Sequence, residues 1–390
     1  MAGRHSHTQR PTRSSTDRGS LRLPLIVGTV VVAMAAVAAV VVVVPKVTSS
    51  RAATAPVSAA QARADGDVAP PFTVVATSPV NTATQVPSDA SITVQLSDPL
   101  APDSPTPTLS PMVAGSWQLL TPTTFTFVAT APFVPSSTET VTIPADVTDI
   151  AGRQLGTTTS VQFSVAAGST LRLQQLLASL NYLPLSFTAA GPLVAPQEAA
   201  EAQAGSFAWR WSVPAALEAL WTEGTANTIT RGAVMAFEDQ HGMKTDGVAG
   251  PAVWEALVTA AAAGSMDPVP YNYVYVTETL PESATVYSDG AEVYSTLANT
   301  GVPAAPTDVG TFPVYDRFVS TTMTGTNPDG SKYSDPGIPW VSYFSGGDAL
   351  HGYVRGSYGF PQSDGCVEMP PAHAAIVYPL TPIGTLVTVD

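Results

Sequence analysis

Residues 340–369 of the 390-residue chain read WVSYFSGGDALHGYVRGSYGFPQSDGCVEM, and this stretch decides how the C-terminal part is interpreted. Cys366 is the only cysteine in the chain, and His351 lies fifteen residues before it. A lone cysteine is ordinarily a small buried hydrophobic residue. Here Gly365 directly precedes it and permits a tight turn that exposes the sulfur. Because an imidazole can take a thiol proton and later protonate a leaving amine, Cys366 and His351 are a candidate acyl-transfer pair.

The order of the two residues narrows the kind of acyl-transfer site. In papain-like enzymes and related wall amidases the cysteine comes well before the histidine. Sortases place the histidine first but need an arginine beyond the cysteine, and neither Arg nor Lys follows Cys366. The stretch resembles the L,D-transpeptidase (YkuD) family, whose signature is a His, a short spacer and Ser/Thr-His/Arg-Gly-Cys. The matching residues are His351-Gly352 and Ser363-Asp364-Gly365-Cys366, with Trp340–Gly347 like the strand before the His and Ile383–Val389 like the closing strand.

The resemblance covers residues 271–390 and implies a mostly-β catalytic domain. It implies that Cys366 is the nucleophile and His351 the general base and acid. The main-chain carbonyl of Gly352 would orient the histidine. The backbone N–H groups of Gly365 and Cys366 would form the oxyanion hole. The resemblance implies no metal and no cofactor.

Two acids near the candidate nucleophile depart from the family pattern. Asp364 replaces the basic residue before the glycine, and Glu368 stands where many members have Arg or Asn. An acid beside a thiol resists thiolate formation unless it pairs with a cation. We expect the Asp364 side chain to face solvent, because a reversed charge is tolerated best where nothing depends on it. The residues expected to line the site are Ser363, Asp364 and Tyr353.

The reaction implied by the resemblance is acyl transfer on peptidoglycan. The thiol attacks a tetrapeptide stem at its bond to D-Ala and expels D-Ala, and an amine of a second stem resolves the thioester into a 3→3 cross-link. Carbapenem-type inhibitors are expected to acylate the same thiol. Two alternatives stay open: an L,D-carboxypeptidase or hydrolase on the same scaffold, and a non-catalytic wall-binding scaffold.

The N-terminal segment differs from the rest of the chain in charge. The chain has a net charge of −14, made up of +4 in residues 1–45 and −18 beyond them, and so it lacks the basic footprint of a nucleic-acid binder. Leu25–Val44 is an apolar run long enough to span a bilayer, and the arginines before it favour an N-terminus inside the cell. We predict a cytoplasmic segment (1–24), a single-pass transmembrane helix (25–44), a linker (45–71) and a body outside, in the cell wall. A cleavable signal peptide is the alternative.

Residues 72–167 are predicted to form a β-sandwich that acts as a spacer. Residues 91–96, 123–128 and 138–143 alternate polar and apolar side chains, with turn-forming residues between them. The segments Val74–Val80 and Asp149–Arg153 resemble bacterial immunoglobulin-like domains. The 36 prolines and 29 glycines of the chain disfavour a long helical bundle, and a single cysteine excludes an internal disulfide or a Cys-rich zinc site.

Residues 168–262 are predicted to form a small helical bundle. A first helix carries leucines on one face, at positions 173, 176, 177 and 180. Thr230 can cap a second helix that ends at His241. Pro251 can be the first residue of a third helix. Residues 233–254 resemble the peptidoglycan-binding domain-1 family, which implies peptidoglycan as a partner. A segment of about 45 residues separates the first two helices, longer than the family's connection. We expect His241 and His373, on a further helix, to be structural.

Overall fold

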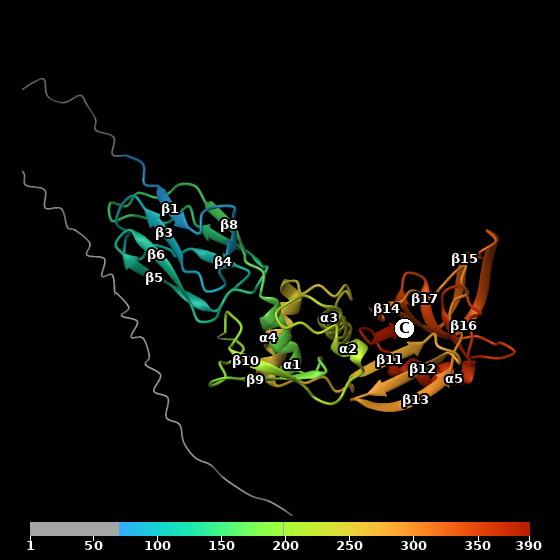
Figure 1. Cartoon of the computed structure of the whole chain (residues 1–390). Coiled ribbons are helices and arrows are strands. Elements are labelled where there is room, and N and C mark those ends of the chain that lie inside the picture. The colour runs from blue at the N-terminus through green and yellow to red at the C-terminus, as the bar shows by residue number, and fades with distance from the viewer. Residues whose placement is uncertain (1–69, 198) are drawn as a thin grey trace, which may run out of the picture. The chain divides into compact units, whose positions relative to one another are not determined.

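The computed structural model describes residues 70–197 and 199–390, and its elements are labelled in Figure 1. The predicted anchor at residues 25–44 lies outside these described residues. Within residues 70–197 and 199–390, no helix has both the length and the apolar character needed to cross a membrane.

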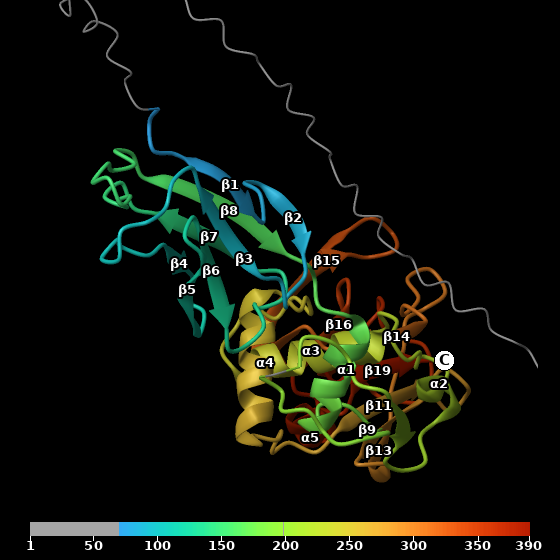
Figure 2. The ribbon, with the colours of Figure 1, turned by 90° about the vertical axis from the view of Figure 1, so that its left-hand side faces the viewer.

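The first described domain is a β-sandwich, as predicted. One sheet has the order β1-β3-β6-β5, formed by Val74–Ser78, Ile92–Leu96, Thr124–Ala129 and Gly115–Thr121. The other has the order β2-β8-β7-β4, formed by Ala83–Val86, Thr159–Val165, Thr138–Ile143 and Thr108–Ser110 (Figure 2). Alternate side chains of these strands, among them Phe125, Phe127, Val141 and Ile143, are buried in one core. The period-2 pattern therefore placed the strands correctly, because each strand faces a core on one side only.

The second domain packs three helices around leucine and aromatic side chains. They are α1 (Thr170–Ser179), α3 (Thr228–Gln240) and α4 (Pro251–Ala263). Leu176, Leu177, Phe237 and Leu257 are buried together. The long segment between α1 and α3 contains the hairpin of β9 (Leu185–Ala189) and β10 (Gly205–Trp209) and the short helix α2 (Ala215–Glu218).

The helix ends in this domain confirm one prediction and correct another. Pro251 is the first residue of α4, as expected. Thr230, however, is not the cap of α3. Asn227 occupies that position and its Oδ1 accepts the N–H of Thr230 at 2.9 Å. Thr230 lies within the first turn and is buried, where its hydroxyl accepts a hydrogen bond from Gln174 Nε2 at 3.0 Å.

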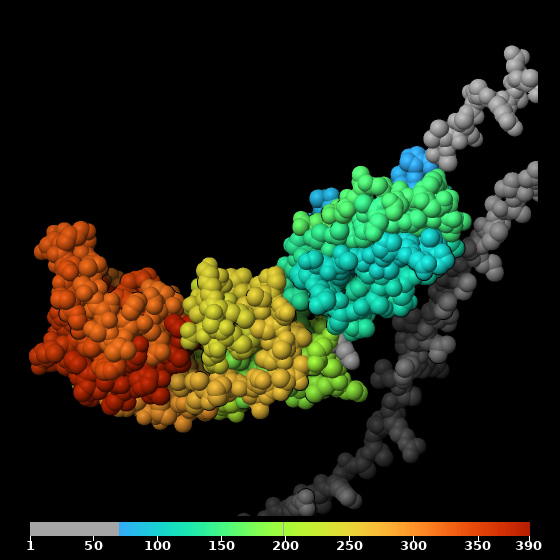
Figure 3. Space-filling model, turned by 180° about the vertical axis from the view of Figure 1, so that it is seen from behind, coloured from blue at the N-terminus to red at the C-terminus, as the bar shows by residue number. Residues whose placement is uncertain are grey.

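The third domain contains two sheets. The first has the order β13-β12-β11-β19-β14, formed by Ala291–Leu297, Ser283–Ser288, Asn272–Thr277, Leu386–Val389 and Gly310–Pro313. The second has the order β15-β16-β17-β18, formed by Asp316–Thr326, Lys332–Ser345, Asp348–Gly352 and Val367–Met369. Asp289-Gly290 and Asp329-Gly330 make the turns of the β12–β13 and β15–β16 hairpins, as their sequences indicate. The tip of the β15–β16 hairpin projects beyond its domain in Figure 1 and appears as protruding orange atoms in Figure 3.

Helix α5 (Pro371–Val377) covers strand β17 next to the candidate histidine. A Cβ added at Gly352 would lie 2.9 Å from the Cα of Pro371, so only glycine allows the helix to approach this closely. The helix therefore closes one side of β17 and leaves the other side to form the site.

Candidate active site

Two parallel strands bring His351 and Cys366 together. Strand β17 pairs with β18 in a register that sets Leu350 opposite Val367 and His351 opposite Glu368. Cys366 directly precedes β18 and so lies beside Ala349, two residues before the histidine. Because strand side chains alternate in direction, residues 349 and 351 share a face. The loop between the strands thus returns the cysteine to the neighbourhood of the histidine.

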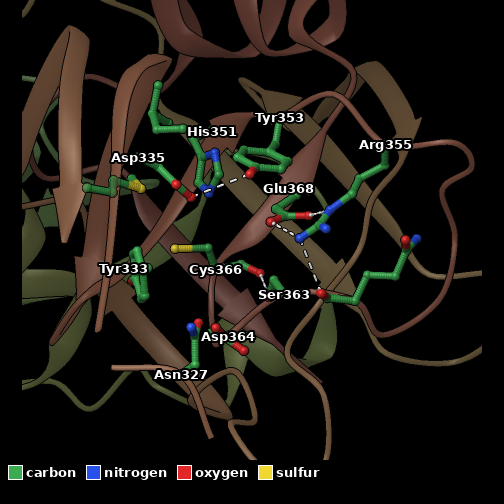
Figure 4. A pocket seen from close by; sticks show the side chains of 13 residues that line it. Asn327, Tyr333, Asp335, His351, Tyr353, Arg355, Ser363, Asp364, Cys366 and Glu368 are labelled. Carbon is green, nitrogen blue, oxygen red and sulfur yellow. Dashed lines mark hydrogen bonds and ion pairs between the residues drawn. The ribbon is translucent and has the colours of Figure 1, made fainter. Parts of the chain in front are cut away.

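Both residues line one cavity of about 280 Å³ (Figure 4). Strand β16 and the hairpin that it forms with β15 supply one wall, and the β17–β18 loop supplies another. The lining residues are Met323, Asn327, Tyr333, Asp335, Ile338, His351, Tyr353, Arg355, Gln362, Ser363, Asp364, Cys366 and Glu368. The expected lining residues Ser363, Asp364 and Tyr353 are among them.

The imidazole of His351 is held in one orientation and is 3% exposed. Its Nδ1 lies 3.1 Å from the carbonyl oxygen of Gly352, as the family resemblance implies. Because a carbonyl only accepts, Nδ1 carries the proton and Nε2 keeps a free lone pair. Burial lowers the pKa of His351 below its usual value, and so the ring is neutral at neutral pH. The ring of Tyr353 meets it edge-on, with centroids 6.1 Å apart.

The thiol of Cys366 contacts the backbone at the start of β17. Its Sγ lies 3.7 Å from the carbonyl oxygen of Gly347. Burial raises the pKa of Cys366 to about 12, and the charges of nearby acids add to this rise. In the part of the chain that the structure describes, no hydrogen bond joins the thiol to His351. The site therefore holds a neutral thiol and a neutral imidazole rather than an ion pair.

The turn before Cys366 has a φ of +115° at Gly365, a conformation that favours glycine. The N–H of Gly365 donates to Ser363 Oγ at 3.2 Å, and that hydroxyl donates to the carbonyl of Cys366. Ser363 is only 2% exposed, so its hydroxyl needs these partners. The Gly365 N–H therefore has a partner in this structure, and its expected role as an oxyanion donor stays a prediction. Among the described residues, the Cys366 N–H has no acceptor and remains available.

Glu368 has a cationic partner, the condition that the sequence analysis left open, in an arginine that it did not single out, and its charge still adds to the rise of the Cys366 pKa. Arg355 Nε lies 2.7 Å from Glu368 Oε2, and Arg355 Nη2 lies 2.8 Å from Oε1. The guanidinium also lies over the ring of Tyr353, 4.7 Å from its centroid. Arg355 could have been found in the sequence, since it is the only cation between His351 and Cys366.

Asp364 is exposed to solvent and also lines the cavity, so the expectation that its side chain faces away from the cavity stays a prediction. Figure 4 shows its carboxylate on the same side of the cavity as Asn327. No group of three His, Cys, Asp or Glu side chains in residues 70–197 and 199–390 is arranged to hold a metal ion.

Comparison with known proteins assigns each of the three domains. Residues 272–389 match the L,D-transpeptidase catalytic domain (YkuD), the segment that contains both His351 and Cys366. Residues 67–165 match a bacterial Ig-like domain, and residues 222–257 match a peptidoglycan binding domain. No curated protein matches the chain.

Solved L,D-transpeptidase structures are also similar to the chain. One from Mycobacterium smegmatis is 13% identical, with 82% of this chain and 100% of that chain covered and a TM-score of 0.28. L,D-transpeptidase 3 from Mycobacterium tuberculosis is 13% identical, with coverages of 82% and 98% and a TM-score of 0.29. The catalytic domain of the Enterococcus faecium L,D-transpeptidase is 26% identical, with coverages of 32% and 100% and a TM-score of 0.29. With TM-scores this low, the assignment of the L,D-transpeptidase domain rests on the sequence match to the family.

The two other histidines of the described residues have structural partners. His241, just past α3, places Nδ1 2.8 Å from the carbonyl of Phe237 and stacks on the ring of that residue. His373, on α5, places Nδ1 2.8 Å from Thr296 Oγ1. Neither lines the cavity that contains His351 and Cys366, which agrees with the structural roles expected for both.

Proposed function

We propose that the protein is an L,D-transpeptidase that uses Cys366 to transfer an acyl group between peptidoglycan stem peptides and forms 3→3 cross-links. The observation that carries the proposal is the placement of the only cysteine and a buried, carbonyl-oriented histidine in one cavity of an L,D-transpeptidase domain.

In the first half-reaction the Cys366 sulfur attacks the carbonyl carbon at the bond between the L-centre of the third stem residue and D-Ala. Since the thiol pKa is raised to about 12, a free thiolate is scarce at neutral pH. His351 Nε2 therefore takes the proton as the sulfur–carbon bond forms. The Cys366 N–H stabilises the oxyanion. Collapse breaks the amide bond, His351 protonates the leaving amine of D-Ala, and a thioester remains.

In the second half-reaction an amine of another stem attacks the thioester carbonyl. His351 accepts a proton from this amine as the new amide bond forms, and the proton returns to the sulfur when the thioester breaks. Water in place of the amine would give a tripeptide, the product of a carboxypeptidase. The residues of the chain act in these steps by nucleophilic attack, by proton transfer and by hydrogen bonding.

The other parts of the chain fit a cell-wall setting. We propose that the helical domain contacts the glycan of peptidoglycan, with support from its match to a peptidoglycan binding domain. We also propose that residues 25–44 anchor the protein, with residues 45–390 on the outer side of the membrane. Recovery of the native protein in the membrane fraction after a high-salt wash is the expected result. A mature N-terminus found between Pro45 and Pro70 would mean that the segment is cleaved.

The catalytic proposal is tested with a disaccharide-tetrapeptide substrate and mass spectrometry of the products. A cross-linked dimer with release of D-Ala is the expected result. Tripeptide alone would mean that water is the acceptor and that the protein is a carboxypeptidase. An unchanged substrate would favour the scaffold alternative, provided that the Cys366→Ala variant gives the same spectrum.

A further inference from the structure

The carboxyl group of Asp348 lies directly against the turn that carries the nucleophile. A Cβ placed on Gly365 would be 2.4 Å from Asp348 Oδ1, so the carboxyl group occupies the space that a side chain at residue 365 would need. The residue before Asp348 contacts the sulfur itself, since the carbonyl oxygen of Gly347 lies 3.7 Å from Sγ. Gly347 and Asp348 therefore contact the thiol and the turn, respectively.

A second loop fixes the position of Asp348. The N–H of Asp308 donates to Asp348 Oδ2 at 2.9 Å. The Asp308 carboxylate accepts in turn from Ser345 Oγ at 2.7 Å, which ties the loop before β14 to the β16–β17 turn. Asp348 Oδ1 has no hydrogen-bond donor among the described residues and faces Gly365. Within those residues Asp348 also makes no ion pair, so no cation neutralises its charge.

We propose that Asp348 is a positioning residue of the active site, which fixes the Gly365–Cys366 turn and, together with burial, keeps the Cys366 thiol protonated through its negative charge until substrate is bound. The proposal deepens the proposed function and rests on Cys366 being the nucleophile. A resting thiol that stays neutral is protected from alkylation and oxidation, since the thiolate is the reactive form. Substrate binding would then have to precede proton transfer to His351.

The ionisable groups around Asp348 set the pH at which it acts. Burial raises the pKa of Asp348 to about 6, the Asp308 carboxylate adds to the rise, and the Asp308 N–H opposes it. The other titratable groups that face it are Cys366 on the β17–β18 loop, Tyr315 before β15 and Tyr333 on β16. Asp348 is therefore neutral in acid and negative at neutral pH. A negative charge next to a thiol favours the protonated thiol, so its removal lowers the thiol pKa.

Alkylation with iodoacetamide tests the proposal, because the chain contains no cysteine besides Cys366. The second-order rate constant is measured on the full chain from about pH 5 to 9 for the wild type and for Asp348→Asn. Asparagine keeps the shape and the acceptor for the Asp308 N–H but removes the charge. We expect Asp348→Asn to react about three- to tenfold faster at about pH 8. Asp329→Asn, which removes an equal charge at the exposed β15–β16 turn, is expected to match the wild type.

Superimposable profiles for wild type and folded Asp348→Asn would overturn the proposal, since a merely structural aspartate would not move the rate. If Asp348→Asn does not fold, His351→Gln provides a second test. This variant removes the imidazole, the other titratable group beside the thiol, so the ionisation of Asp348 should still flatten the rise of the alkylation rate with pH between about pH 5 and 7. A uniform rise of about tenfold per pH unit across that range would contradict the proposal.

The alkylation measurement does not depend on turnover, so the two proposals can fail separately. If Asp348→Asn is alkylated faster but the wild type leaves the tetrapeptide unchanged, the transpeptidase function is refuted and the role of Asp348 is supported. If the wild type forms cross-linked product but Asp348→Asn is alkylated at the wild-type rate, the function is supported and the role of Asp348 is refuted.

Discussion

Arg355 and Glu368 form a two-bond ion pair in the wall of the cavity, with Nε 2.7 Å from Oε2 and Nη2 2.8 Å from Oε1. The Glu368 side chain is 6% exposed and that of Arg355 is 30% exposed, so the carboxylate depends on the guanidinium rather than on water. Glu368 also lies opposite His351 in the β17–β18 register. Arg355 therefore compensates the charge of a buried carboxylate that lies next to His351.

Removal of the cation should destabilise the catalytic domain. Arg355→Met leaves the buried Glu368 carboxylate unpaired, which we expect to lower the free energy of unfolding by about 1–3 kcal/mol. Urea denaturation measures the loss. The double variant Arg355→Met/Glu368→Gln has no charge to compensate and should recover most of the stability. Equal losses in the single and the double variant would mean that Arg355 acts by packing on Tyr353 rather than by charge.

A carbapenem should add its mass to the wild-type chain through Cys366. Intact-mass spectrometry is expected to show one adduct on the wild type and none on Cys366→Ala. The unfolding curve of Cys366→Ala should match that of the wild type, which shows that the variant is folded. His351→Gln keeps the thiol but lacks the base, so its adduct should form about 100-fold or more slowly. An adduct that persists on Cys366→Ala would place the nucleophile elsewhere in the chain.

The sequence was sufficient for the features that depend on short segments. Cys366 and His351 lie within one stretch of sixteen residues, and their order and spacing carry the family signature. The hairpin turns Asp289-Gly290 and Asp329-Gly330 were predictable because these pairs adopt tight turns with little strain. The β-sandwich followed from alternation, because its strands bury one face only.

The features that could not be predicted depend on how separate segments meet. The contact of Asp348 with Gly365 follows from the parallel β17–β18 register, which no local pattern specifies. The pairing of Arg355 with Glu368 requires the path of the loop between those strands. The buried hydroxyl of Ser363 accepts the N–H of Gly365, a contact that no local pattern specified. Competition for hydrogen bonds among buried groups is settled only when the whole turn is in place.

The stability of the domain should fall in mild acid because of His351. Burial lowers the folded-state pKa of His351 below the usual value of 6.5. Below pH 6.5 the unfolded chain binds a proton that the folded chain does not, so stability is intact above pH 6.5 and falls as the pH drops toward the folded-state pKa. Calorimetry should show the catalytic-domain transition of the wild type falling more between about pH 7 and 5 than that of His351→Gln. Parallel decreases in the two proteins would mean that other groups cause the acid sensitivity.

A side chain at residue 365 should disturb the site in two separable ways. Gly365 has a φ of +115°, which L residues adopt with strain, and a Cβ there would lie 2.4 Å from Asp348 Oδ1. Gly330 is the matched control, because its φ is +85° and nothing lies within 4 Å of an added Cβ.

Gly330→Ala should cost about 1–2 kcal/mol of stability from backbone strain alone and leave acylation by a carbapenem unchanged. Gly365→Ala should cost more, by about 1 kcal/mol or above, and should slow acylation at least about tenfold because the turn must move. The double variant Gly365→Ala/Asp348→Ser removes the clash but keeps the strain and loses the hydrogen bond from the Asp308 N–H, so it should recover only part of the additional loss. Equal stability of Gly365→Ala and Gly330→Ala would show that Asp348 does not press on the turn.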